Sequence, residues 1–444
     1  MIIITGVPDY FMLLCCGYKV LWYKHILFLL LRFNKTTMAI TVKHADELTL
    51  FLLTEAVRRF EVEPGYADKI LQRLFLEKKG LNNRDRGCVS EMFYDLLRNK
   101  RLLESGMNFS GYKPIERSYL LASAYILWRD IQVPKRLELP RFNFKAYLTR
   151  VASNAESNPA IRFSVPDWLF VLGKAELGDR WEKELDALNS SPLQALRANT
   201  LKTTVDDLQQ KFADQGINCT KATDVANGLV MDRKGNLFLT HEFHEGLFEF
   251  QDISSQRVAE LLDPKPGMLV MDACAGNGGK TLHLAALMEN KGRLVAADNL
   301  VYKLSTMRRR AQRAGVLNVE SVDAAIPNAF LPFHDLVDRL LLDVPCTGTG
   351  VWRRNPEARW LMKDTTLENL HTQQREIIAS YSVMVKPGGQ MVYSTCSILP
   401  SENRLQVEAF LAQNSNFYLV KEIQLFPSET EGDGFYMALI GRNA

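Results

Sequence analysis

Two cysteines in the second half of the chain follow short apolar runs that are typical of buried strands. Residues 340–342 lead into Asp343 and Cys346, and residues 390–393 lead into Cys396. A thiolate can attack an electron-poor carbon and so split one difficult reaction into two easier steps. A single cysteine beside an apolar run is more often a small core residue, and that alternative stays open for each one taken alone. Because both stand at strand ends, one beside an acid, we expect a catalytic pair.

A glycine-rich stretch at residues 272–281, Asp-Ala-Cys-Ala-Gly-Asn-Gly-Gly-Lys-Thr, joins an apolar run to a helical pattern. Glycine lets the backbone approach a ligand closely. The phosphate-binding GxxxxGK[ST] motif does not fit, because Cys274 stands where its first glycine should be. We therefore expect a nucleoside-like cofactor such as S-adenosylmethionine, with a purely structural strand-to-helix turn as the alternative. The expected cofactor-binding residues of this loop are Cys274, Ala275, Gly276, Asn277, Gly278, Gly279 and Lys280.

Two acids further along the chain complete the expected cofactor site. Asp298 ends the next apolar run, roughly 20 residues after the glycine loop, where an acid commonly binds ribose hydroxyl groups. Asp323 follows the short run 319–322 and could approach the edge of an adenine ring. The alternative for Asp323 is an ordinary acid in a surface loop.

The elements that must position these residues are strands and helices in alternation. Apolar runs at 269–272, 293–297, 340–342 and 390–393 are separated by helical patterns at 281–288, 303–314 and 366–385. This alternation predicts an α/β, Rossmann-like domain over residues 253–444, with a mostly parallel sheet and helices on both faces. Ligands of such sheets bind at the carboxyl ends of the strands, where the cysteines, the acids and the glycine loop would meet.

The 444 residues are enough for further domains upstream. Residues 38–162 carry apolar residues at helical spacing, which predicts an all-α domain. Residues 163–252 combine a long helical pattern at 168–188 with strand-like runs at 228–231 and 247–251, which predicts a small α+β module. The basic residues of the helical part are interpreted as phosphate contacts or as a solvated helix face. They are Arg84, Arg86, Arg98, Lys100 and Arg101.

Charge and cysteine usage narrow the class of protein. A formal net charge of +3 is small, so any surface that binds nucleic acid must be local. The seven cysteines are odd in number and form no CxxC pair, which argues against a disulfide framework and against a metal site. We therefore expect a cytoplasmic monomer with reduced thiols and no bound metal.

The first 37 residues differ from the rest of the chain. Residues 11–33 are apolar but are interrupted by Lys19, Lys24 and His25, so no uncharged stretch is long enough to span a bilayer. A regular amphipathic pattern begins at Met38. We interpret residues 1–37 as a non-native or disordered extension upstream of the true start, with a peripheral membrane anchor as the alternative. We expect no membrane partner for the remainder.

Three segments resemble motifs of a known family. DACAGNGGKT (272–281), LLLDVPCTGTGVWRRNPEARW (340–360) and YSTCSILPSENR (393–404) are similar to motifs of the bacterial 16S rRNA cytosine-5 methyltransferases of the RsmB/Sun type. The helical part resembles the NusB-like RNA-binding domain of that family. RANTLK (197–202) and FEFQDISSQ (248–256) resemble its linking module. The resemblance runs from about Met38 to the end of the chain.

The resemblance implies a role for each motif. Cys396 would attack carbon 6 of a cytosine, so that carbon 5 can accept a methyl group from S-adenosylmethionine, and Cys346 would assist release of the product. Asp343 would contact the target base, which must leave its stack, and it would also belong to the cofactor site. The chain departs from the family at Gly276-Asn277, where Ala-Pro is usual. Losing a rigid proline makes the loop more flexible, so we expect cofactor binding to survive but to be weaker.

Two basic clusters are further candidates for RNA contact. One contains Arg308–Arg310 and Arg313, and the other contains Trp352, Arg353, Arg354, Arg359 and Trp360 after the Pro-Cys motif. Stacking and phosphate contact suit an unpaired base, with ordinary surface arginines as the alternative.

The expected substrate is 16S rRNA, and tRNA is the alternative substrate. A non-catalytic RNA-binding assembly factor is the alternative from another class, although such a protein has no use for two cysteines and Asp343.

Overall fold

The computed structural model describes residues 42–135, 137, 139, 142–233 and 235–444. Residues 1–37, for which an extension or a membrane anchor was predicted, lie outside this part of the chain. Two compact units are present. One contains the described residues up to Phe170 with Asn355–Leu361, and the other contains Val171–Arg354 with Met362–Ala444. Within the described residues, no helix is both long enough and apolar enough to cross a membrane.

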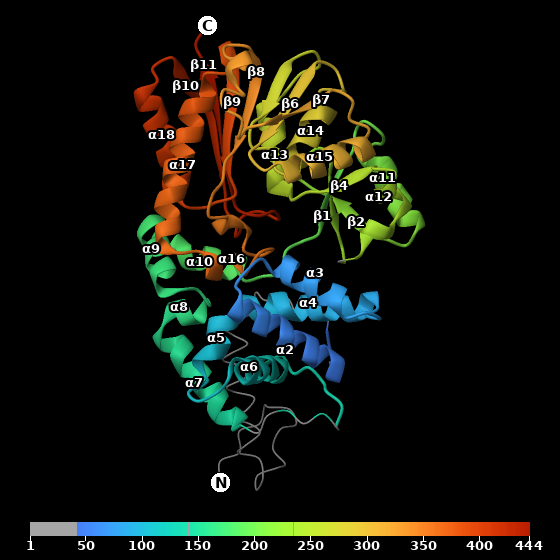
Figure 1. The fold of residues 1–444 in the computed structure, drawn as a ribbon, viewed down its shortest axis with the longest axis vertical. Coiled ribbons are helices and arrows are strands. Elements are labelled where there is room, and N and C mark those ends of the chain that lie inside the picture. Colours follow the sequence, from blue (N-terminus) through green and yellow to red (C-terminus); the bar gives the residue numbers. More distant parts are fainter. Residues whose placement is uncertain (1–41, 136, 138, 140–141, 234) are drawn as a thin grey trace, which may run out of the picture. The chain divides into compact units, whose positions relative to one another are not determined.

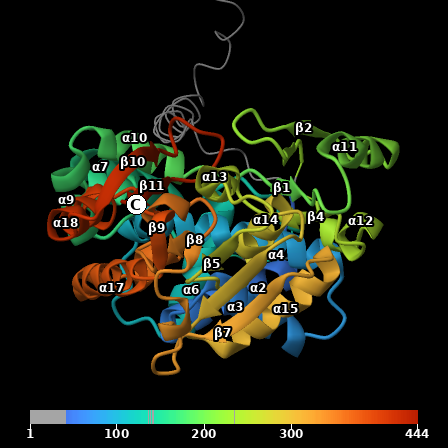
Figure 2. The same ribbon diagram turned by 90° about the horizontal axis from the view of Figure 1, so that it is seen from above.

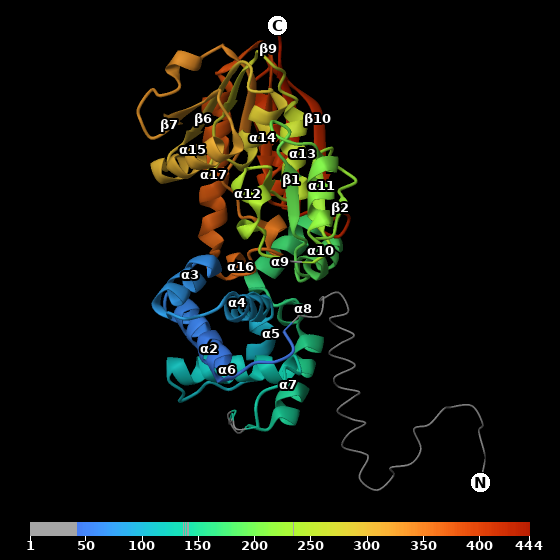
Figure 3. The ribbon, with the colours of Figure 1, turned by 90° about the vertical axis from the view of Figure 1, so that its right-hand side faces the viewer.

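The first unit is built from helices, as the 3.6-residue spacing predicts (Figure 3). Its core is formed by the apolar faces of these helices, with Leu53, Phe93 and Leu97 fully buried. The Asp46 side chain begins the first helix by accepting a hydrogen bond from the Thr49 backbone amide at 2.8 Å, as an N-cap. The helices are α2 (Glu47–Val62), α3 (Ala67–Glu77), α4 (Asn83–Arg98), α5 (Lys100–Ser105), α6 (Pro114–Trp128), α7 (Phe144–Ser157), α8 (Pro159–Arg162) and α16 (Ala358–Leu361).

A buried carboxylate joins two helices of this unit, α4 and α6. Asp95 of α4 is 4% exposed and accepts hydrogen bonds from the Tyr125 hydroxyl at 2.9 Å and from the Arg129 guanidinium at 2.8 Å. Arg98 lies 3.4 Å from the same carboxylate and is also buried. One carboxylate therefore pairs with both arginines inside the helical unit.

The second unit contains a small antiparallel sheet of strand order β2-β3-β1-β4. The α+β character predicted for this part is present, but the single helix expected at 168–188 is two helices. Gly178 lies between them with a φ of +58°, a conformation that ends a helix and suits glycine. The elements are α9 (Asp167–Leu177), whose first residues belong to the first unit, α10 (Arg180–Leu188), β1 (Ala195–Ala198), α11 (Val205–Asp214), β2 (Cys219–Lys221), β3 (Gly228–Met231), α12 (His241–His244) and β4 (Phe248–Phe250).

The remainder of the second unit is a seven-stranded sheet of order β10-β11-β9-β8-β5-β6-β7 (Figure 1). The five strands from β9 to β7 are parallel, whereas β11 and β10 are antiparallel. The predicted α/β, Rossmann-like domain is therefore confirmed. Its elements are α13 (Ile253–Leu262), β5 (Leu269–Asp272), α14 (Gly279–Leu287), β6 (Arg293–Asp298), α15 (Val301–Ala314), β7 (Val319–Asp323), β8 (Val337–Asp343), α17 (Asp364–Ser382), β9 (Val385–Thr395), α18 (Arg404–Gln413), β10 (Phe417–Leu425) and β11 (Phe435–Arg442).

Helices cover both faces of this sheet (Figure 2). Helices α13, α14 and α15 pack on one face, where Leu284 and Met307 meet Val270 of β5 in one apolar cluster. Helices α17 and α18 pack on the other, where Ile378 and Phe410 join a second cluster. A strand that is covered on both faces consists of consecutive apolar residues. For this reason the strands could be predicted from apolar runs in the sequence.

We predict that Asp95→Ala destabilises the helical unit by about 3–5 kcal/mol, because removing one partner leaves buried guanidinium groups without a counter-charge. Hydrogen exchange of the α4 and α6 amides, measured by mass spectrometry, should become faster. The control is Glu77→Ala, which removes an exposed partner of Arg59 in the same unit and should leave these amides unchanged. Equal protection in both variants would contradict a stabilising role for Asp95.

Candidate active site

Five parallel strands end at one edge of the large sheet, and the predicted site residues lie there. Asp298 and Asp323 are register partners at the ends of β6 and β7. Asp343 ends β8 and is paired with Ser394 of β9, two residues before Cys396. The structure thus brings together the acids, the glycine loop after β5 and both cysteines.

The glycine loop presents open backbone at this edge. A Cβ atom added at Gly276 or Gly279 would meet no heavy atom within 4 Å, so a ligand can approach the main chain at both positions. Gly278 is different, because its Cβ would lie 2.3 Å from Met307 Cγ, and its φ of +85° also requires glycine. Asp298 supports the loop by accepting a hydrogen bond from the Gly276 amide at 2.9 Å.

Burial changes the ionisation of the groups around this loop. Desolvation raises the pKa of Asp272, which is 1% exposed, to about 7, although the Thr281 hydroxyl donates to it at 2.7 Å and opposes that shift. Burial, followed by the nearby Asp272, raises the pKa of Cys274 well above its usual value. Cys274 is therefore a neutral thiol at physiological pH. The carboxylates of Asp298 and Asp323 at this edge suit a cationic ligand, and S-adenosylmethionine carries a positive sulfonium and a positive ammonium group.

The sulfur atoms of Cys346 and Cys396 are 3.4 Å apart. The contact with Cys396, together with burial, raises the pKa of Cys346 well above that of a free thiol. Cys346 is thus protonated at neutral pH and can donate its hydrogen toward the Cys396 sulfur.

Asp343 is held in place by two donors. Lys280 Nζ donates to Asp343 Oδ2 at 2.7 Å, and the Ser394 hydroxyl donates to Asp343 Oδ1 at 3.0 Å. Burial acts to lower the pKa of Lys280, but the Asp343 charge and hydrogen bond outweigh it, so the pKa of Lys280 is raised. Lys280 is therefore an ammonium group, and it links the glycine loop to the strand that carries Asp343.

Glu402 is a site residue that was not recognised in the sequence. It is fully buried and accepts hydrogen bonds from the Thr347 amide at 2.8 Å, from the Thr347 hydroxyl at 2.5 Å and from Gln374 Nε2 at 3.1 Å. Because Thr347 directly follows Cys346, this carboxylate fixes the loop that carries the thiol. The only signal was its place inside the YSTCSILPSENR segment, because no spacing rule marks an acid six residues after a cysteine.

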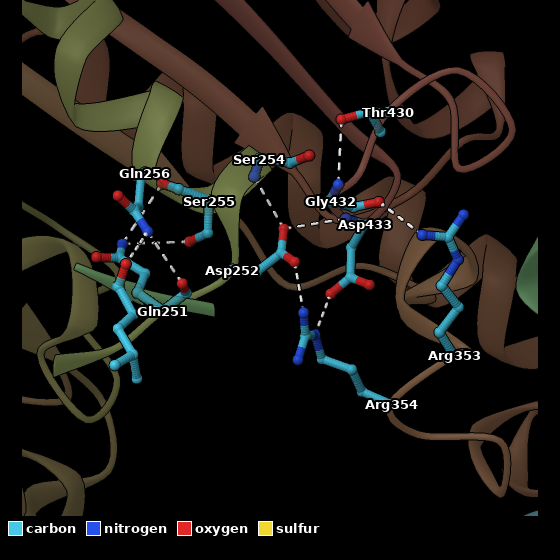
Figure 4. A network of polar contacts seen from close by, with 11 residues as sticks. Gln251, Asp252, Ser254, Ser255, Gln256, Arg353, Arg354, Thr430, Gly432 and Asp433 are labelled. Atoms are coloured by element: carbon cyan, nitrogen blue, oxygen red, sulfur yellow. Dashed lines mark hydrogen bonds and ion pairs between the residues drawn. The ribbon is translucent and has the colours of Figure 1, made fainter. Parts of the chain in front are cut away.

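The residues after the Pro-Cys motif are not the RNA-stacking surface that the sequence suggested. Arg354 lies between the carboxylates of Asp252, at 2.6 Å, and Asp433, at 2.5 Å (Figure 4). Arg353 is 8% exposed and donates to the carbonyl oxygens of Ala187, Pro427 and Gly432. Trp352 is fully buried. That prediction was wrong for these residues, because their side chains are engaged inside the protein.

The same correction applies to Arg359 and Trp360, which lie in the helical unit. Arg359 is fully buried and faces the carbonyl oxygens of Phe163 and Ser164, each at 3.4 Å. The Trp360 indole donates to the Leu97 carbonyl at 2.8 Å. Arg359 therefore contributes to folding of the helical unit rather than to an exposed RNA surface, whereas Trp360 is only partly buried.

Several other basic residues also have internal partners. Arg98 is buried beside Asp95, Lys100 pairs with Glu104 at 2.5 Å, and Arg101 pairs with Asp167 at 2.7 Å. Arg310 and Arg313 both pair with Glu249. Phosphate contact therefore stays a prediction only for those of the predicted basic residues that are exposed. These are Arg84, Arg86, Arg308 and Arg309.

The strand order β7-β6-β5-β8-β9-β11-β10, with a glycine loop after β5 and an acid at the end of β6, is typical of S-adenosylmethionine-dependent methyltransferases. Residues 259–441 match the family described as 16S rRNA methyltransferase RsmB/F. Residues 165–237 match the RsmF/B-like ferredoxin-like domain. The chain belongs to the RsmB/F family, as the resemblance in the sequence indicated, and it is an S-adenosylmethionine-dependent methyltransferase.

Similar proteins span most of the chain. The probable ribosomal RNA small subunit methyltransferase B of Synechocystis sp. is 31% identical over 406 residues, which cover 84% of this chain and 90% of that protein. The ribosomal RNA small subunit methyltransferase B of Vibrio cholerae is 30% identical over 392 residues, covering 81% and 90%. Among solved structures, that of PH0851 is 25% identical with a TM-score of 0.72, covering 88% of this chain and 98% of its own.

We predict that Cys396→Ala makes Cys346 easier to alkylate at a given pH. The variant removes the sulfur contact that is the largest cause of the raised pKa, so the thiolate of Cys346 forms at lower pH, whereas burial continues to oppose it. Peptide mass spectrometry of iodoacetamide labelling between pH 7 and 10 would measure the shift. An unchanged labelling profile would mean that burial alone controls Cys346.

Proposed function

We propose that this protein transfers a methyl group from S-adenosylmethionine to carbon 5 of a cytosine in 16S rRNA, through a covalent bond between Cys396 and carbon 6. The observation that supports this most is the 3.4 Å separation of the Cys346 and Cys396 sulfurs at the sheet edge that also carries the glycine loop. A covalent route through the pyrimidine ring requires one nucleophile, and a second thiol within contact distance of it can assist the later release of the product.

Each step of the proposed route is assigned to a residue. The Cys396 thiolate forms a bond to carbon 6, and the electrons of the 5,6 double bond move to carbon 5, which becomes nucleophilic. S-adenosylmethionine supplies the electrophilic methyl group that carbon 5 attacks. A general base then accepts the carbon 5 proton, the electrons of that C–H bond restore the 5,6 double bond, and the Cys396 sulfur leaves carbon 6 as a thiolate. Cys346 assists this release. Asp343 contacts the ring edge at N3, where protonation draws electrons away from carbon 6.

The cofactor is assigned to the glycine loop and the acids around it. The open backbone at Gly276 and Gly279 allows close approach of a ligand, and Asp298 and Asp323 stand side by side at the next two strand ends. The remaining members of the proposed site are Cys274, Ala275, Asn277, Gly278 and Lys280. Within the described residues, no group of three or more acids, histidines and cysteines is arranged to bind a metal.

The substrate is assigned from the family. The matched family is described by its action on 16S rRNA, and two relatives are named as small-subunit rRNA methyltransferases. We place the reaction in the cytoplasm, where reducing conditions keep two adjacent thiols from forming a disulfide.

We predict that Cys396→Ala abolishes methylation and that Cys346→Ala accumulates a protein–RNA adduct. Without Cys396 no bond to carbon 6 forms, whereas without Cys346 the bond forms but its cleavage is slowed. Denaturing gels of each variant with RNA and cofactor would show the adduct as a slower band. Cys88→Ala, at a cysteine of the helical unit, should turn over normally without a trapped band. Normal turnover of Cys346→Ala would overturn the assignment of roles.

We predict that deleting the gene removes one 5-methylcytosine from 16S rRNA and none from tRNA. Bisulfite sequencing of both RNA classes from the deletion strain and its parent measures this directly. Complementation with the wild-type gene should restore the mark, and complementation with the Cys396→Ala variant should not. Loss from a tRNA would assign the rival substrate, and loss from neither would favour a binding role in assembly.

A further inference from the structure

Helix α15 contacts the glycine loop at two adjacent residues. Arg310 Nη1 donates to the Asn277 carbonyl oxygen at 2.8 Å. One turn earlier on the same helix, Met307 is fully buried and lies against Gly278, where it leaves no room for a Cβ atom. The loop backbone is therefore restrained from the side of α15 at two successive residues.

Arg310 is itself oriented by an acid of the small sheet. Its Nη2 donates to Glu249 Oε2 at 2.8 Å, and Glu249 of β4 is nearly inaccessible, with 4% of its side chain exposed. The other carboxylate oxygen of Glu249 accepts a hydrogen bond from Arg313. A guanidinium with two partners in fixed directions has little freedom to move, so the Asn277 carbonyl meets a pre-oriented donor.

The segment that follows β1 of the small sheet also fixes the end of α15. The Asn199 side-chain amide donates to the Ala314 carbonyl oxygen at 2.8 Å, and Lys202 Nζ donates to the Arg313 carbonyl oxygen at 2.8 Å. These two carbonyls belong to the last turn of the helix, where no intrahelical donor is available. The segment RANTLK (197–202) therefore anchors α15, and the helix provides a rigid connection between the small sheet and the glycine loop.

We propose that Arg310, oriented by Glu249, is a positioning residue for the cofactor loop, and that the small α+β module thereby strengthens S-adenosylmethionine binding. The inference rests on the proposed assignment of the glycine loop to the cofactor. Asn277 is exposed and stands where the resembling family usually has proline, so the loop lacks that covalent restraint. The hydrogen bond from Arg310 supplies a restraint in its place.

The test is the affinity of the full-length protein for S-adenosylmethionine, measured by calorimetry. Arg310→Ala should weaken binding by roughly tenfold, the order expected for one charge-assisted hydrogen bond that is partly exposed. The KM for the cofactor should rise by a similar factor, while kcat at saturating cofactor stays unchanged. A general loss of folding would instead lower kcat and the thermal midpoint together.

Two neighbours on the same helix provide matched controls. Arg313→Ala removes a guanidinium that shares Glu249 but has no hydrogen bond to the loop. Arg309→Ala removes an exposed one that bonds only to Thr306 among the described contacts. Both should bind the cofactor within about twofold of the wild type. Equal weakening by Arg313→Ala and Arg310→Ala would overturn the proposal, as would an unchanged affinity in Arg310→Ala.

Two conservative variants keep the proposal testable if Arg310→Ala does not fold. Arg310→Lys can reach one partner but not both, and Glu249→Gln keeps the shape of the acid but removes its charge, so each should weaken binding by less than Arg310→Ala. If Glu249→Gln bound S-adenosylmethionine as tightly as the wild type does, Glu249 would have no role in orienting Arg310. Failure of the wild type to bind S-adenosylmethionine would instead contradict the assignment of the loop, and so the proposed function.

Discussion

The position of two sulfur atoms depends on strands β8 and β9 lying side by side in parallel. Asp343 and Ser394 are register partners at their ends, and adjacent strands are separated by only about 4.8 Å. The chain after β8 must then fold back across the end of β9 to bring Cys346 to Cys396. The loop crosses β9 at Gly350, whose backbone amide donates a hydrogen bond to the Cys396 carbonyl oxygen at 2.9 Å. A Cβ atom at this position would lie only 2.1 Å from the Gly434 carbonyl oxygen. Only glycine allows this crossing, and Glu402 and Arg354 fix the loop on either side of it.

This crossing explains why so many charged groups are buried nearby. The role proposed for Cys346 requires that a substrate reach this loop from solvent, so apolar packing alone cannot hold the loop in place. Hydrogen bonds from Thr347 and Gln374 to Glu402, and from Arg354 to Asp252 and Asp433, provide directional constraints instead. Burial and the neighbouring Asp252 charge raise the pKa of Asp433 to about 7, against the opposing effect of its ion pair with Arg354.

Much of the catalytic domain was predictable because a parallel sheet buries its strands on both faces. The runs at 269–272 and 293–297 became β5 and β6 almost without change, and the residues that end them met at one edge. The break at Gly178 was missed, because apolar residues on either side continued the helical pattern. Glu402 was missed for a different reason. Its partners, Thr347 and Gln374, are 55 and 28 residues away in the sequence, and pairing over such distances leaves no local pattern.

The arginines are the residues whose contacts were predicted least well from the local sequence pattern. A guanidinium beside an aromatic ring suits phosphate and base contact, but its five donors suit buried carbonyl oxygens and carboxylates equally well. Arg353 meets carbonyls of two distant segments, one at Ala187 and one at Pro427 and Gly432. Arg310 meets a loop carbonyl and a carboxylate at once. Burying a guanidinium charge costs free energy unless its hydrogen-bond and ion-pair partners are present. Each of these arginines therefore stabilises one conformation of the segments that it contacts. The chain therefore uses much of its positive charge to order its own loops, which is consistent with a net charge of only +3 in a protein whose family acts on RNA.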